Sequence, residues 1–98
     1  MLLGIVATTE FCAEHLVGLT SAAAARGWRC RGFLTDRGVR LLHSADLLEL
    51  VGTNRLDLAV CEHSWEIYGS GAAPAGVTMA SQYQNAELAN QCDKVIVL

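Results

Sequence analysis

The apolar run LLGIVAT at residues 2–8 decides the fold of this 98-residue chain. Such an uninterrupted run, with Ile5 and Val6 at its centre, is typical of a strand buried on both faces. Working outward from it, further short apolar runs occupy residues 28–35, 56–61, 77–80 and 95–98. Helical patterns separate these runs, at residues 11–26, 44–51, 64–68 and 81–92.

Local signals mark where these elements begin and end. Gly27 follows the first helical pattern and is a natural stop. Residues 36–38 (DRG) indicate a turn. Ser81 and Gln84 have the spacing of a capping box, so a helix should begin there.

Strands that alternate with helices predict a parallel sheet covered on both faces, and hence an α/β fold. We expect one domain over residues 1–98, a flavodoxin-like three-layer sandwich with a five-stranded parallel sheet. Right-handed crossovers leave few topologies, and the order 2-1-3-4-5 is favoured. Arg29 and Arg31 alternate with other residues at the start of the second strand, which is typical of an edge strand.

The composition excludes several classes of function. Charged residues make up only 17% of the chain and hydrophobic residues 52%, so we expect another subunit to cover part of the surface. A net charge of −3 argues against nucleic acid as a partner. No apolar run approaches the ~20 residues of a membrane span. The first residues lack the basic segment of a signal peptide, which favours a cytoplasmic location. There, the four cysteines would be thiols.

Cysteine and histidine follow two of the predicted strands. Ligands of open parallel sheets gather beyond the carboxyl ends of the strands, where the strand order reverses. In the expected order that crevice lies between strands 1 and 3, which would bring Cys12 towards Cys61 and His63. A helix N-terminus favours a Cys61 thiolate, and His63 could assist it, whereas Glu62 and Glu66 oppose it. The alternative is that Cys61 and Cys12 are buried packing residues, as we expect of Cys30 and Cys92.

A metal site is weighed and not expected. Cys12 with His15 and Cys61 with His63 would supply two sulfurs and two nitrogens, but neither spacing is usual for zinc ligands. The glycine-rich motifs of nucleotide cofactors are also absent from the sequence. We therefore predict neither a metal nor a cofactor.

The chain resembles the DsrE/DsrF/TusD-like family of small sulfur-relay proteins. The resemblance covers most of the length and rests on the first strand and its Ala-rich helix, residues 32–42 (GFLTDRGVRLL), residues 58–64 (LAVCEHS), and the closing helix and strand. It implies a flavodoxin-like fold, a trimeric or hexameric assembly, and a cysteine at the end of the third strand that carries sulfane sulfur as a persulfide. Cys61 matches that position. The acidic and aromatic segment that follows, residues 62–69 (EHSWEIYG), departs from the small and basic residues common in the family.

Two functions of different classes follow. The first is a cytoplasmic sulfur carrier or sulfurtransferase subunit, in which Cys61 accepts the sulfur, His63 modulates it and Cys12 is a second thiol. Its partners would be copies of itself and the sulfur donor and acceptor proteins, with no nucleic acid and no membrane. The alternative is a non-catalytic structural or regulatory subunit of an oligomer, with a small ligand or metal in the same crevice.

Overall fold

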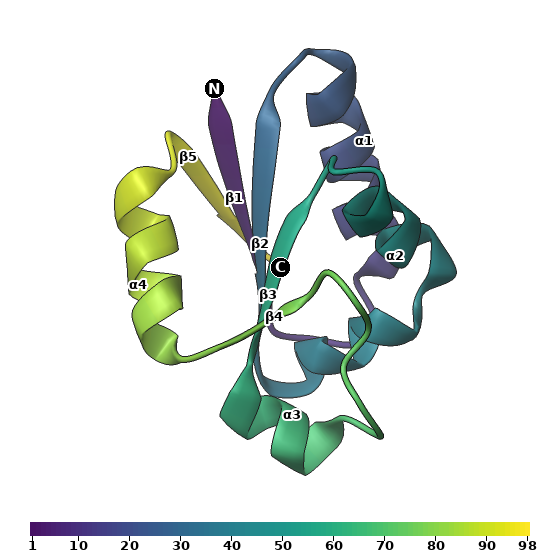
Figure 1. The fold of residues 1–98 in the computed structure, drawn as a ribbon. Coiled ribbons are helices and arrows are strands. Elements are labelled where there is room, and N and C mark those ends of the chain that lie inside the picture. The colour runs from purple at the N-terminus through teal and green to yellow at the C-terminus, as the bar shows by residue number, and fades with distance from the viewer.

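Five parallel strands form a single sheet in the order β4-β3-β2-β1-β5 (Figure 1). The structure, a computed structural model, describes residues 1–98. The strands are β1 (Leu2–Ala7), β2 (Arg29–Leu34), β3 (Asp57–Cys61), β4 (Thr78–Ala80) and β5 (Lys94–Val97). The α-helices are α1 (Ala13–Ala25), α2 (Ala45–Gly52), α3 (Glu62–Tyr68) and α4 (Gln82–Gln91), and a 3-10 helix, η1 (Asp36–His43), follows β2.

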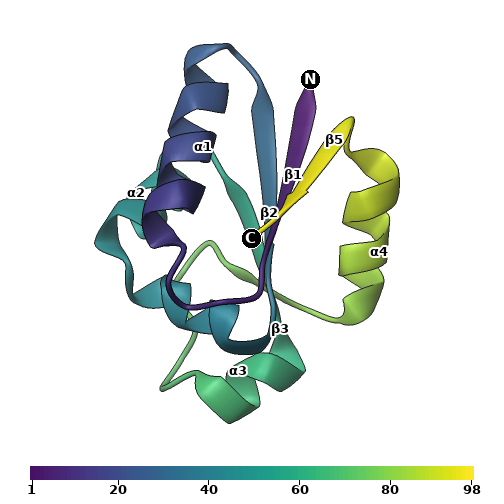
Figure 2. The same cartoon turned by 180° about the vertical axis from the view of Figure 1, so that it is seen from behind.

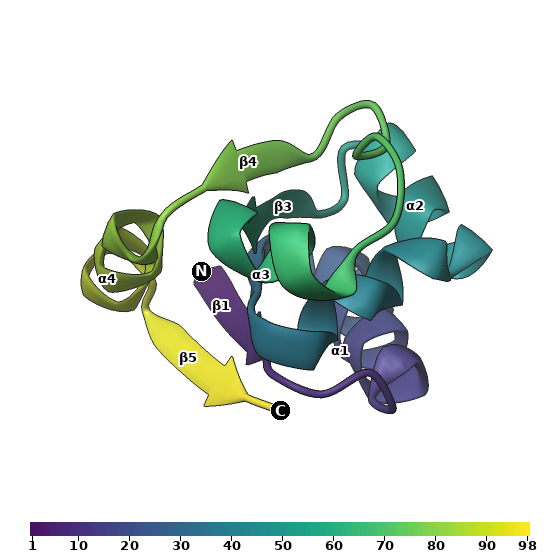
Figure 3. The same ribbon diagram turned by 90° about the horizontal axis from the view of Figure 1, so that it is seen from below.

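The helices divide into three groups around the sheet. Helices α1 and α2 cover one face and α4 covers the other, as the two opposite views show (Figures 1 and 2). Helix α3 and η1 lie at the carboxyl ends of the strands, which Figure 3 shows from below. No helix is long and apolar enough to cross a membrane.

The predicted fold class is confirmed: the chain is a three-layer α/β sandwich around a five-stranded parallel sheet. The observed order 4-3-2-1-5 differs from the expected order 2-1-3-4-5. Strand β2 is the middle strand instead of an edge, because only its first residues reach solvent while Phe33 and Leu34 are fully buried. Arg31 is held over the sheet by an ion pair with Asp57 of the neighbouring β3, at 3.7 Å.

The local signals act as expected. Gly27 takes a left-handed conformation, with φ of 75°, directly after α1. At the start of α4, the Ser81 backbone N–H donates to Gln84 Oε1 at 2.8 Å, and Ser81 Oγ accepts from the Tyr83 N–H. Both halves of the capping box are therefore present.

Helix η1 extends the predicted turn and requires a glycine. A Cβ atom on Gly38 would lie 2.2 Å from the Ala7 carbonyl oxygen, so the 3-10 helix packs directly on the end of β1. This approach places Thr35 and Asp36, at the beginning of η1, over the carboxyl ends of the strands. Glycine at position 38 is therefore a requirement of the fold next to the candidate site.

Two buried clusters lie on opposite faces of the sheet. The larger, of 17 residues, joins the sheet to α1, α2 and η1 and includes Leu16, Leu47 and Leu58. The smaller lies under α4 and consists of Val6, Phe33, Cys61, Ala80 and Leu88. The Cys61 side chain therefore belongs to the thinner side of the molecule.

Candidate thiol site at the carboxyl ends of the strands

Cys61 stands at the junction of β3 and α3. It is the last residue of the strand and the residue that precedes the helix, and only 5% of its surface is exposed. It belongs to the smaller buried cluster, to which β2 contributes Phe33, β4 contributes Ala80 and α4 contributes Leu88. This is the position that the sequence predicted for the candidate thiol, at the N-terminus of α3, where the Ser64 backbone N–H lowers the pKa of the thiol.

Three neighbouring strands deliver polar groups to this thiol. Strands β2 and β4 flank β3, so Thr35, which follows β2, and Gln82, which follows β4, lie beside Cys61. The Gln82 side-chain N–H donates to Thr35 Oγ1 at 3.1 Å. Thr35 Oγ1 also lies 3.5 Å from Ser64 Oγ. Ser64 lies in the first turn of α3, and only 7% of its surface is exposed.

These groups decide the acidity of the thiol. Burial is the largest single influence and raises the Cys61 pKa, but hydrogen bonds from the Ser64 side chain, the Ser64 backbone N–H, Gln82 and Thr35 lower it. The net direction is down, so the Cys61 pKa lies below its ordinary value. The carboxylates of Glu62 and Glu66, which the sequence set against a thiolate, do not reverse this direction.

A hollow of about 370 Å³ opens beside the thiol. Its lining is Cys61, Glu62, His63, Glu66, Ala80, Ser81 and Gln82. His63 is exposed on its wall and is not among the groups that shift the Cys61 pKa. The hollow gives a reactant a way to the edge of the buried sulfur, past an acidic rim formed by Glu62 and Glu66.

The structure does not bring Cys12 to Cys61. The expected crevice between strands 1 and 3 does not exist, because β2 separates them; the strand order reverses between β1 and β5 instead. Cys12 is buried in the larger cluster on the α1 side of the sheet, and its thiol donates to the Thr9 carbonyl oxygen at 3.5 Å. No three His, Cys, Asp or Glu side chains gather as metal ligands, so Cys12, His15, Cys61 and His63 form no common site.

The two remaining cysteines have the opposite acidity from Cys61. Burial raises the Cys30 pKa, and the nearby Cys92 raises it further. Burial also raises the Cys92 pKa, and Asp93 adds to this, although Arg31 acts against both. Cys92 packs under α4, where its Sγ would be 2.8 Å from a Cβ on Gly4. Cys61 is therefore the cysteine that its surroundings favour as a thiolate.

Arg40 of η1 secures α3, on which the site depends. Its guanidinium lies 3.3 Å from a Glu10 carboxylate oxygen in the loop after β1. It also lies 5.5 Å from the centre of the Tyr68 ring, and its Nε–H donates to the Tyr68 carbonyl oxygen at 3.3 Å. One side chain thus joins the end of α3 to η1 and to the β1–α1 loop.

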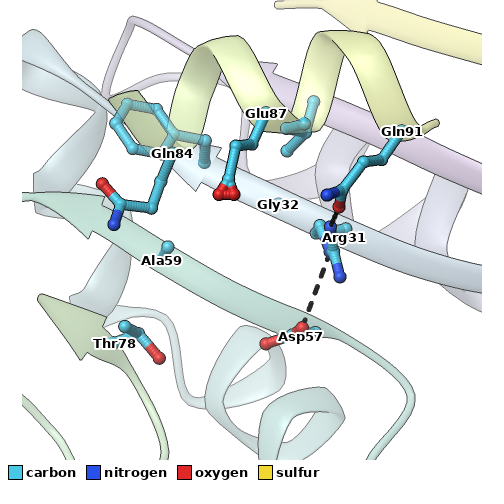
Figure 4. A pocket seen from close by; sticks show the side chains of 10 residues that line it. Arg31, Gly32, Asp57, Ala59, Thr78, Gln84, Glu87 and Gln91 are labelled. Carbon is cyan, nitrogen blue, oxygen red and sulfur yellow. Dashed lines mark hydrogen bonds and ion pairs between the residues drawn. The ribbon is translucent and has the colours of Figure 1, made fainter. Parts of the chain in front are cut away.

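A separate cleft of about 350 Å³ runs between α4 and the sheet (Figure 4). Gln84, Glu87 and Gln91 line its helical wall, and Ala59 and Thr78 lie on its strand side. Arg31 crosses it, bonded to Asp57 and to Gln91. No cysteine or histidine lines this cleft.

The sequence analysis found Cys61 but missed Thr35, Ser64 and Gln82. The signal was present: Thr35 is the first residue after β2, and Gln82 is the second residue after β4. These positions converge only when both strands flank β3, which the expected order did not give. Fold and site together define a class: a small three-layer α/β protein whose parallel sheet presents a buried thiol of lowered pKa at its carboxyl edge.

Comparisons with known proteins agree with this class at the level of the fold. No family model matches the chain, and no curated protein matches its sequence. Among solved structures, the chain is similar to the YchN protein of E. coli, with a TM-score of 0.69 and 15% sequence identity, over 99% of this chain and 97% of that one. YchN has the DsrE/DsrF-like fold. The chain therefore shares the fold of YchN.

Proposed function

We propose that this protein is a sulfur-relay carrier that accepts sulfane sulfur on Cys61 as a persulfide and passes it to an acceptor thiol. One observation carries the proposal: a buried thiol at the carboxyl edge of the sheet, with its pKa lowered by hydrogen bonds and with a hollow beside it. The thiolate is the nucleophile in such exchange, so a lowered pKa increases the fraction of the reactive form at neutral pH. The DsrE/DsrF-like fold is compatible with this role.

The transfer proceeds by two exchanges without net oxidation. The Cys61 thiolate attacks the outer sulfur of a donor persulfide, R–S–SH. A new sulfur–sulfur bond forms on Cys61, the donor's own bond breaks, and R–S⁻ leaves. In the second exchange, an acceptor thiolate attacks the outer sulfur of Cys61–S–SH, and Cys61 leaves as a thiolate. A thiol of low pKa leaves faster, so the same surroundings assist both steps.

His63 and the acidic rim would control access to the sulfur. His63, on the wall of the hollow, is proposed to modulate exchange by taking up or returning the proton of the incoming thiol. Cys12 has no part in this scheme, because it is buried on the other side of the sheet. A carrier of this kind would work in the cytoplasm, where thiols stay reduced.

The test is to load the reduced protein with polysulfide and to measure intact and peptide masses. We expect one added sulfur atom on the peptide that contains Cys61, removed by reductant and absent from Cys61→Ser. The matched controls Cys12→Ser, Cys30→Ser and Cys92→Ser should load as the wild type does. Equal loading of Cys61→Ser and wild type would contradict the carrier and favour the structural-subunit alternative.

We also propose that the protein works as a closed homo-oligomer, a trimer or a hexamer. The low charge of the chain supports this, as do large apolar side chains that face solvent in the single chain: Phe11 is 87% exposed, Tyr83 69% and Val97 68%. Sedimentation at micromolar concentration should give a closed assembly. A monomer at that concentration would overturn this proposal and leave the carrier proposal intact.

A further inference from the structure

We propose that Thr35, Ser64 and Gln82 form a donor cradle for negatively charged sulfur on Cys61. The cradle is defined by three side-chain groups, two hydroxyls and one amide, that come from the ends of β2 and β4 and from the first turn of α3. It holds the thiolate before reaction. Its second role, to hold the terminal sulfur of a persulfide, rests on the proposed function, whereas the first does not.

The direction of the hydrogen bonds carries this inference. The Ser64 hydroxyl oxygen already accepts from the Asp36 backbone N–H at 2.8 Å. The Thr35 hydroxyl oxygen already accepts from the Gln82 amide at 3.1 Å. A hydroxyl whose oxygen is engaged as an acceptor keeps its own hydrogen to donate. The two hydroxyl oxygens lie 3.5 Å apart, which is long for a bond between them, so both hydrogens can turn to another acceptor. That acceptor is Cys61, at the end of β3 between β2 and β4, whose pKa both side chains lower.

The amide of Gln82 is oriented in the same sense. Its Oε1 accepts from the Asn85 side-chain N–H, one turn along α4, at 3.2 Å. With the oxygen held by Asn85, the amide nitrogen faces Thr35 and Cys61. Gln82 therefore presents hydrogens and no oxygen to the sulfur, which is the arrangement that an anion requires.

Backbone geometry fixes the cradle from the other side. Asp36 takes a left-handed conformation, with φ of 55°, which is unusual for a residue other than glycine. This conformation accompanies the bond that its N–H makes with Ser64. Strained backbone of this kind persists where the surrounding structure holds it, and it gathers at functional sites.

No cation contributes to the cradle. The ionisable groups around it are Asp36 and Arg37 on η1, Glu62, His63 and Glu66 on α3, and Tyr83 in the first turn of α4, all of them exposed, while β4 supplies none. None of them is among the groups that shift the Cys61 pKa. Neutral donors must therefore stabilise the charge on the sulfur. Such donors bind a bare thiolate and a persulfide alike, since both are anions, and they hold a neutral thiol less strongly.

The experiment measures the rate of Cys61 alkylation by iodoacetamide against pH, resolved by peptide mass. Thr35→Val keeps the shape of the side chain and removes the hydroxyl. The midpoint of the curve of alkylation rate against pH should therefore move to higher pH. The rate at neutral pH should fall roughly tenfold, the factor that ~1.4 kcal/mol represents. Thr35→Ser restores the hydroxyl and should restore the midpoint. A purely structural role for Thr35 would not separate the two variants in this way.

Gln82→Glu tests the amide independently. The carboxylate replaces hydrogens with a charged oxygen and should raise the midpoint, yet it sits in the first turn of α4, where the helix dipole favours it, so the fold is kept. Asn90→Asp makes the same chemical change on an exposed residue near the other end of α4 and should leave the midpoint unchanged.

The outcomes separate the cradle from the carrier. Wild-type midpoints in both Thr35→Val and Gln82→Glu would overturn the cradle, even if Cys61 loads with sulfur. Shifted midpoints in a protein that never takes up sulfur from polysulfide would uphold the cradle as a thiolate site and overturn the carrier. If both hold, Thr35→Val should also lose its bound sulfur to reductant several times faster than Thr35→Ser.

Discussion

Replacing Gly38 by alanine should destabilise the protein strongly, although it adds a single methyl group. The new Cβ would lie 2.2 Å from the Ala7 carbonyl oxygen and 2.8 Å from the Ala7 carbonyl carbon. These are backbone atoms, and the same oxygen accepts the Thr35 N–H at 3.0 Å, so they cannot move aside without breaking a bond at the end of β2. Overpacking costs about 1–3 kcal/mol, and a backbone clash belongs at the upper end.

Gly18→Ala is the matched control, because the same methyl group on α1 would meet no atom within 4 Å. Alanine is favoured over glycine inside a helix by about 0.5–1 kcal/mol, so this variant should be more stable than wild type. Thermal unfolding followed by circular dichroism should give a Tm lower by roughly 10–20 °C for Gly38→Ala, since each kcal/mol moves the Tm of such a domain by about 4–8 °C. If Gly38→Ala unfolds within a few degrees of wild type, the packing of η1 on β1 is not as described.

Two further predictions concern the support of α3 and the behaviour at alkaline pH. In urea unfolding, Arg40→Gln should lower the free energy of unfolding by about 1 kcal/mol, because it loses the ion pair with Glu10 and the contact with Tyr68. Arg37→Gln loses only a contact with the Tyr68 ring at 5.7 Å and should change the free energy less. Equal effects of the two variants would contradict the role of Arg40. The free energy of unfolding should be unaffected by these thiols below the ordinary cysteine pKa of 9.0 and should fall as the pH rises above it, because burial raises the pKa of Cys30 and of Cys92 in the folded chain. The double variant Cys30→Ala/Cys92→Ala should show a shallower fall. Cys61 has the opposite sign, so Cys61→Ser should lack the stability that wild type gains as the pH rises to 9.0, and parallel curves for all three proteins would refute this assignment.

The elements of the fold were predictable because their signals are local. A helix that ends at a glycine with positive φ, and another that begins with a capping box, are determined by a few adjacent residues, and Gly27 and Ser81 act in this way. Apolar runs of strand length between helices leave a parallel sheet as the arrangement that buries them. The five strands and four α-helices therefore follow from the sequence.

The strand order was not predictable because it depends on contacts between distant residues. Both orders satisfy right-handed crossovers. What distinguishes them includes the burial of Phe33 and the ion pair of Arg31 with Asp57, which place β2 inside the sheet. The arginines at the start of β2 suggested an edge strand because charged residues there usually face solvent. The sequence around them does not reveal that Asp57, on the neighbouring β3, pairs with Arg31.

The candidate site was predictable in part for the same reason. Cys61 lies at a strand end in any order of strands, so its position at the carboxyl edge did not depend on the topology. Its partners did: Thr35 and Gln82 reach it only because β2 and β4 both flank β3, and Cys12 is kept away because β2 stands between. The direction of the Cys61 pKa shift follows from these partners, so it required the structure.

The measurement that tests the central claim most directly is the order in which the four cysteines of the native protein are alkylated at neutral pH. Isotope-coded iodoacetamide, added in less than one equivalent and read by peptide mass, ranks them in one experiment. Exposure alone would put Cys92 first, since Cys61 is only 5% exposed and Cys92 is half-buried. If hydrogen bonds hold Cys61 as a thiolate, Cys61 is labelled first and Cys30 among the last. Labelling that begins at Cys92, or that spreads evenly over all four, would contradict the account of Cys61 as the reactive thiol.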